Sequence, residues 1–163
     1  MSLDSDIQLL TRVKLFEGFT HDQLRLLAFG AEALTVGHGT RLYRRDELAQ
    51  GGFVVVRGKI ELLSGLNDSI ISTHSAGSLI GEMALISETR HAATAVATEH
   101  SEILKIPRAL FMRMLEEYPE LAELLQLRIM QSMDEFMEQL DRIKAKLDHA
   151  TDLANRPKKT VSN

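Results

Sequence analysis

The sequence predicts an α+β protein in which a turn-rich β section, folded as a sandwich or barrel, lies between N-terminal and C-terminal helices. The 10 glycines all lie between Gly18 and Gly81, and residues 82–163 contain none. Glycine supplies the positive-φ corners of tight turns, whereas a glycine-free stretch rich in Leu, Met and Glu favours helix. Helices and strands in separate stretches of a chain are typical of the α+β class rather than of alternating β-α-β folds.

Composition bounds the class of protein further. The 163 residues suit one domain of the usual size, roughly 100–200 residues. The chain has no cysteine, which excludes disulfides, cysteine-based zinc sites and thiol catalysis. No apolar run approaches the roughly 18 residues of a membrane helix, and the acidic start is unlike a signal peptide, so we expect a cytoplasmic protein. The net charge of −4 argues against strong non-specific nucleic-acid binding.

Two short helices are predicted before the β section. Residues 4–6 (Asp-Ser-Asp) can cap the first, whose apolar face is Ile7, Leu10 and Val13. Residues 20–23 have the spacing of a capping box for the second. Its apolar residues then follow at helical spacing: Leu24, Leu27, Ala28 and Ala31.

Short strands at regular spacing make up the β section, as in a sandwich or barrel. Arg57-Gly58 is a tight hairpin candidate between two of them. The expected strands are 33–36, 41–43, 53–56, 60–63, 69–74, 94–98 and 102–106.

The C-terminal helices begin at Pro107, which suits a first helical turn. The first has the apolar face Leu110, Phe111, Met114 and Leu115, and Tyr118-Pro119 ends it. A much longer helix is expected from about Pro119 to Ala150. We therefore divide the chain into residues 1–118, the long helix 119–154, and a disordered tail 155–163.

The long helix carries a seven-residue apolar repeat. Its residues step alternately by 4 and 3: Ile129, Met133, Phe136, Leu140, Ile143, Leu147, Ala150 and Ala154. A single helix that extends beyond a small domain has nothing of its own to cover this seam, which favours a parallel coiled-coil homodimer. The interface would hold Met133, Phe136, Leu140, Ile143 and Leu147. The alternative is that the seam packs back on the same domain.

Residues 79–94 contain the motif that indicates a ligand-binding site. A predicted strand leads into Gly81 and a short helical turn, and a loop then leads to the small residues Ala92 and Ala93. Gly81 lets the backbone approach a ligand closely, and free N–H groups at a helix start bind an anion. The Glu82 carboxylate can accept hydrogen bonds from a sugar hydroxyl. This chemistry suits a nucleotide with a compact, singly charged phosphate.

Gly81-Glu82-Met83-Ala84-Leu85, followed by Ala92-Ala93-Thr94, resembles the phosphate-binding cassette of cyclic nucleotide-binding domains. These domains occur in catabolite activator and Fnr-type regulators, protein kinase A regulatory subunits and cyclic-nucleotide-gated channels. Residues 9–19, 53–62 and 110–119 look like the family's N-terminal helix, central hairpin and B helix. The resemblance covers about residues 9–140.

The resemblance implies an eight-stranded antiparallel β-roll (a double-stranded β-helix or jelly roll) flanked by N-terminal helices and a long C-terminal dimerisation helix. Glu82 would bind the ribose 2′-hydroxyl of cyclic AMP or cyclic GMP, and Thr94 would lie where the wall nears the base. The long helix would form the dimer and cover the base. The backbone N–H groups around the cyclic phosphate would be those of Met83, Ala84, Ala92 and Ala93.

One departure from the family bears on affinity. The family's phosphate-binding Arg usually stands where this chain has His91, and Arg90 comes one residue earlier. Losing a charge-assisted hydrogen bond costs roughly 1.5–3 kcal/mol, about 10- to 150-fold in affinity. Neighbouring residues of an extended chain point opposite ways, so Arg90 and His91 cannot both face the pocket easily; each is a candidate phosphate ligand, with a surface position as the alternative. A second departure is residues 44–47 (Arg-Arg-Asp-Glu), where the family often has a glycine-containing turn, and we expect an altered connection there.

We expect no enzyme, metal or cofactor. The six histidines lack metal-ligand spacing, and the sequence has neither a G-x-S-x-G nucleophile elbow nor a Walker loop.

The leading hypothesis is a homodimeric sensor module that binds a cyclic nucleotide or similar small anion and signals to a separate output protein, with no membrane association. About ten residues follow Asp152, too few for a helix-turn-helix, so we expect no sequence-specific DNA binding unless the chain is a fragment. The alternatives are a dimerisation scaffold that has lost nucleotide binding through His91, and the effector domain of a transcription regulator lacking its helix-turn-helix.

Overall fold

The structure, a computed structural model, describes residues 2–65 and 67–154, without the side chains of 132–133 and 150–154. The predicted tail 155–163 therefore lies outside the described residues. The chain forms two compact units, one ending at Ala122 and one beginning at Glu123, and each is described by itself. No helix among the described residues is long and apolar enough to cross a membrane.

The N-terminal helices form where the sequence predicts them. Helix α1 spans Leu3–Leu10, and its cap is Ser2 rather than residues 4–6: the Ser2 hydroxyl accepts from the Ser5 N–H at 3.2 Å. A 3₁₀ turn, η1, covers Lys14–Phe16. Helix α2 spans His21–Gly30 and has the predicted capping box, in which Thr20 and Gln23 each bond the other's backbone N–H. Such a box fixes a helix start because it satisfies donors that have no partner within the helix.

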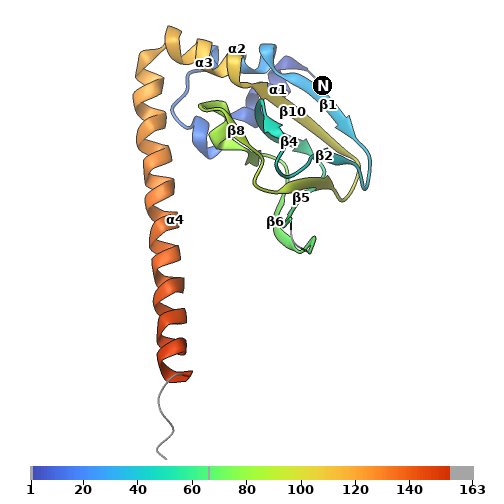
Figure 1. The fold of residues 1–163 in the computed structure, drawn as a ribbon. Helices are drawn as coiled ribbons and strands as arrows, with labels where there is room; N and C mark the ends of the chain where they lie inside the picture. Colours follow the sequence, from blue (N-terminus) through green and yellow to red (C-terminus); the bar gives the residue numbers. More distant parts are fainter. Residues whose placement is uncertain (1, 66, 155–163) are drawn as a thin grey trace, which may run out of the picture. The chain divides into compact units, whose positions relative to one another are not determined.

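All strand pairs are antiparallel, as predicted, and most strands lie in two four-stranded sheets with the orders β1-β10-β4-β7 and β2-β9-β5-β6 (Figure 1). Two strands of two residues each, β3 and β8, extend the predicted set, whereas β7 is the strand expected before Gly81. The strands are β1 (Glu32–Val36), β2 (Arg41–Tyr43), β3 (Leu48–Ala49), β4 (Gly51–Arg57), β5 (Ile60–Leu63), β6 (Ile70–His74), β7 (Leu79–Ile80), β8 (Thr89–Arg90), β9 (Thr94–Ala97) and β10 (Ser101–Pro107).

A buried core lies between these two sheets. Its members come from strands of both: Tyr43, Phe53, Val55, Ile60, Ile80, Ala95, Ala97 and Ile103. β9 contributes the two small members of this cluster, Ala95 and Ala97, both fully buried.

A register shift in β2 places two side chains that are two residues apart, Arg41 and Tyr43, on opposite faces of the sheet. Arg41 pairs with Val96 and Tyr43 pairs with Ala95, with a bulge between the two pairs. Arg41 is exposed, whereas Tyr43 and Ala95 are buried. A bulge breaks the regular alternation of a strand, and here it allows one three-residue strand to supply both an outer-face cation and an inner-face aromatic ring.

Helix α3 (Arg108–Glu117) follows Pro107 as predicted, and α4 (Pro119–Ala154) follows Tyr118. Within the first unit, α3 packs against α2, β10 and η2 (Glu82–Leu85), and α1 packs against α2. The three helices gather at one end of the sheets (Figure 1). They therefore support the segment that carries the candidate site.

Candidate functional site

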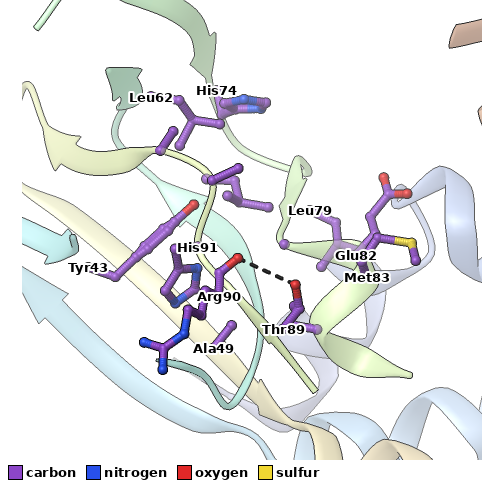
Figure 2. A pocket seen from close by; sticks show the side chains of 15 residues that line it. Tyr43, Ala49, Leu62, His74, Leu79, Glu82, Met83, Thr89, Arg90 and His91 are labelled. Carbon is purple, nitrogen blue, oxygen red and sulfur yellow. Dashed lines mark hydrogen bonds between the residues drawn. The ribbon is translucent and has the colours of Figure 1, made fainter. Parts of the chain in front are cut away.

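A cavity of about 420 Å³ lies beside the predicted cassette. The strands β2, β5, β6, β7 and β8 and the turn η2 all contribute to it, so residues far apart in sequence meet there (Figure 2). Its lining includes the predicted site residues Gly81, Glu82, Met83, Ala84, Arg90, His91, Ala92 and Ala93.

Gly81 begins the cassette turn in the left-handed region, with φ of 80°. Residues with a Cβ rarely adopt this conformation, which explains the glycine after β7. The chain then enters η2, whose Ala84 is buried while Glu82 and Met83 are exposed. Ala84 lines the cavity as well, and the buried Leu85 fixes the end of the turn in the core.

Glu82 stands at the rim of the cavity. Partial burial raises the pKa of its carboxyl above the ordinary value. In Figure 2 the carboxylate lies to one side of the cavity, away from His91. The same side chain also lines a second hollow of about 320 Å³, together with Arg12 and Lys14. A carboxylate in this position can accept hydrogen bonds from hydroxyl groups of a ligand.

His91 and Arg90 differ in environment. His91 is buried, and its ring meets the Tyr43 ring edge-on with centroids 3.6 Å apart. Burial lowers the pKa of His91, an effect that Glu47 opposes, so the imidazole is held in the neutral form. Arg90 is exposed, and its Nη1 donates to the Asp46 carbonyl oxygen at 2.7 Å. Both residues line the cavity, and Figure 2 shows the Arg90 guanidinium on the side of His91 that faces away from Glu82.

Thr94 does not line this cavity. Its hydroxyl oxygen accepts a hydrogen bond from the Arg45 N–H at 3.1 Å, and its side chain lines a hollow formed with residues of the β2–β3 connection. The Thr94 side chain, which was expected to approach the base of the ligand, therefore faces a different hollow.

Two polar residues of the cavity were not identified from the sequence. Burial raises the pKa of Tyr43 to about 12, so its hydroxyl stays protonated and can donate to a ligand. His74 shares a 2.9 Å hydrogen bond with Ser72 through Nε2, and burial lowers the pKa of His74. Both lie on strands that the sequence placed correctly, but no local pattern shows which strands face the cassette.

Arg108 holds the cassette against the first turn of α3. Its Nη1 donates to the carbonyl oxygens of Ala49, Ala84 and Ser87 at 2.9, 3.3 and 3.1 Å. No motif of the sequence singled out Arg108. Because its partners lie in β3, in η2 and just after η2, Arg108 is a positioning residue for the site.

The predicted seam of α4 is present as an exposed apolar stripe. Phe136, Leu140, Ile143 and Leu147 are between 41 and 61% exposed. The side chain of Met133, the fifth predicted interface residue, lies outside the described residues. Exposed apolar residues at steps of 4, 3 and 4 on one helix are typical of a surface that pairs with another helix.

The fold and the site together define a β-roll module with a cavity beside its cassette turn. The chain belongs to the cyclic nucleotide-binding domain family, whose sequence model matches residues 34–118. The predicted family and fold class are therefore confirmed.

Solved structures support the same placement. A cyclic nucleotide-binding-like protein from Brucella abortus is 43% identical, covering 69% of this chain and 99% of that one, with a TM-score of 0.63. The catabolite activator protein of Thermus thermophilus is 24% identical, covering 80% and 62% of the two chains, with a TM-score of 0.69. The latter similarity concerns the fold alone.

Curated relatives include much longer proteins. Lysophospholipase NTE1 of Chaetomium globosum is 25% identical over 118 residues, which are 71% of this chain and 8% of that protein. Neuropathy target esterase sws of Drosophila ananassae is 31% identical over 84 residues, 50% of this chain and 6% of that protein. This chain spans less than a tenth of either relative, so the similarity covers only a small portion of them.

Proposed function

We propose that this chain is a non-enzymatic sensor module that binds a cyclic nucleotide, cyclic AMP or cyclic GMP, in the cassette cavity. The observation that carries this proposal is the cavity of about 420 Å³, which the cassette turn and the strands of the roll enclose together. Its polar groups suit the parts of such a ligand: Glu82 for a sugar hydroxyl, and the Tyr43 hydroxyl and the His91 imidazole as hydrogen-bond donors.

Binding would be transmitted to a separate output protein by a homodimer built on α4. The exposed stripe of Phe136, Leu140, Ile143 and Leu147 supports this part of the proposal. Coiled-coil pairing would bury these residues between two copies, because side chains at a and d positions insert between those of the facing helix. A ligand that binds more tightly to one arrangement of the two helices would then increase the fraction of dimers in that arrangement.

A second candidate function is a dimerisation scaffold that binds no nucleotide. The state of the cationic groups favours it: burial lowers the pKa of His91, which disfavours the imidazolium, and the Arg90 guanidinium, although charged, is bonded to the Asp46 carbonyl. If the chain is a sensor, His91 limits its affinity for the nucleotide, and an arginine there should strengthen binding. If the chain is a scaffold, it should bind no nucleotide with either residue.

Calorimetric titration of cyclic AMP and cyclic GMP into three proteins separates these functions. We expect weak binding by the unaltered protein, binding about 10- to 150-fold tighter by His91→Arg because a charge-assisted bond is gained, and none by Glu82→Ala. His100→Arg and Glu88→Ala are matched controls, since both residues are exposed and lie outside the cavity lining. Absence of binding by both the unaltered protein and His91→Arg would favour the scaffold.

A further inference from the structure

The outer face of the sheet that contains β2 carries a second concave surface, which we call the arginine groove. It comprises a hollow of about 470 Å³ and an adjoining one of about 500 Å³. Arg41, Arg44 and Gly39 line both hollows, and Arg45 lines the one of about 470 Å³. None of these four residues lines the cassette cavity, although Tyr43 lines both that cavity and the hollow of about 500 Å³.

Two of the three guanidinium groups are available for a ligand. Among the described residues, the ion pair of this groove is Arg45 Nε with Asp46 Oδ2 at 3.9 Å. Arg41 and Arg44 are exposed and have no carboxylate within 4 Å in the described part of the chain. An arginine fork binds a carboxylate through two parallel hydrogen bonds. The groove thus presents two unpaired forks whose positions the strand and the turn determine.

The backbone around these arginines is held in place. The Arg45 N–H donates to the Thr94 hydroxyl, and the Asp46 N–H donates to the His91 carbonyl oxygen at 2.8 Å. Gly65 leaves room for the Arg45 side chain, since an added Cβ would overlap the guanidinium atoms. A pre-arranged cationic surface loses less conformational entropy on binding than a mobile one.

Two features indicate that an extended acidic peptide is the partner. β2 is an edge strand, so its side away from β9 pairs with no other described strand, and the hollow of about 500 Å³ is lined by residues between 39 and 47 around that strand. An extended segment can lie along such an edge. The half-buried Leu63 and Val96 give the hollow of about 470 Å³ an apolar floor. Asp46 and Asp68 also line this hollow and Glu47 lines the other, so the carboxylates of the peptide contact Arg41 and Arg44 rather than the groove as a whole.

We propose that the arginine groove binds a carboxylate-rich, extended segment of a partner protein, with Arg41 and Arg44 as the charged anchors. This site is separate from the cassette, and its occupation requires no nucleotide. It is a candidate point of attachment for an output protein.

Fluorescence anisotropy of a labelled ten-residue peptide with four glutamates, in low salt and without nucleotide, tests the proposal. We expect saturable binding that weakens at least tenfold in Arg41→Glu/Arg44→Glu, that weakens with added salt, and that is absent for the same peptide with glutamines. Arg25→Glu, at an exposed arginine of α2 outside the groove, is the matched control and should bind like the unaltered protein. Thermal unfolding by circular dichroism establishes that each variant is folded.

Several results would overturn the proposal. Absence of peptide binding, equal binding of the glutamine peptide, or an unchanged affinity in the double variant would each do so. A labelled DNA duplex that binds more tightly than the peptide through the same arginines would identify a nucleic-acid site instead. A change in the sedimentation of the double variant without loss of peptide binding would assign the groove to contacts between copies. None of these measurements depends on the nucleotide titrations, so the two proposals can fail separately.

Discussion

The two histidines that line the cassette cavity make the stability of the protein depend on pH. Burial lowers the pKa of both His74 and His91 below the ordinary 6.5. The unfolded chain therefore binds more protons than the folded one just below pH 6.5, and the free energy of unfolding falls as the pH falls through that value. Urea denaturation between pH 8 and pH 5.5 should show this decrease.

Single replacements identify the source of this dependence. His91→Gln and His74→Gln should each flatten the decrease, because glutamine does not titrate. His100→Gln should leave it unchanged, since His100 is exposed. A decrease that persists in full in both cavity variants would assign it to other groups.

Asp46 occupies the turn that the sequence analysis marked as departing from the family. Its φ is 69°, and it is one of two non-glycine residues with positive φ among those described. Asp tolerates this region better than residues without a short polar side chain. We expect Asp46→Ala to be about 1 kcal/mol less stable than Asp46→Gly in chemical denaturation, because alanine opposes a positive φ and glycine does not.

Asp46→Ala and Asp46→Gly act as controls for each other. Both remove the carboxylate that lies 3.9 Å from Arg45, so loss of that exposed ion pair affects them equally. Equal stability of the two would show that the backbone at residue 46 is not under this constraint.

At the scale of elements, Arg108 joins the cassette turn to α3. Its three carbonyl partners belong to Ala49, Ala84 and Ser87. Arg108→Met keeps much of the side-chain length but removes the donors, so we expect a loss of about 1.5–3 kcal/mol in unfolding free energy.

Arg113→Met on the exposed side of α3 is the control for this change and should cost much less. The effect should also extend to the site: amide hydrogen exchange of residues 82–87 should accelerate in Arg108→Met, because the turn loses its anchors. Unchanged exchange there would contradict a positioning role.

Elements were predictable where local chemistry determines them. The capping box at Thr20 and the break at Tyr118-Pro119 depend on neighbouring residues, and both are found as predicted. The strands β3 and β8 were missed because two residues cannot show an alternating pattern. The cap of α1 was placed too late because several residues before Ile7 can act as caps.

The site was predictable only in its contiguous part. The cassette residues form one motif and meet at one cavity, whereas Tyr43 and His74 reach it through strand pairing that the sequence does not specify. Thr94 was assigned by resemblance, and its hydroxyl instead bonds the Arg45 N–H. Which of Arg90 and His91 is buried follows from the Tyr43 ring, again a contact between distant residues.

At the scale of the whole molecule, the α4 seam makes a testable prediction about assembly. Sedimentation equilibrium should give a dimer mass for the unaltered protein and a monomer mass for Leu140→Asp, because a carboxylate at an a or d position would be buried without a partner. Ala145→Asp carries the same charge on a seam-distant position of the helix and should remain dimeric. A monomer mass for the unaltered protein at high concentration would contradict the coiled coil.

The hydrogen bonds from residues 46 and 47 to His91 have a consequence for regulation. The Asp46 N–H donates to the His91 carbonyl, and the His91 N–H donates to the Glu47 carbonyl at 2.9 Å. If occupation of the cavity displaced His91, the adjoining arginines would shift with it, and thermodynamic reciprocity requires equal effects in both directions. A protein attached at the outer face would then alter how strongly the interior holds a small molecule, by the same factor as the small molecule alters the attachment.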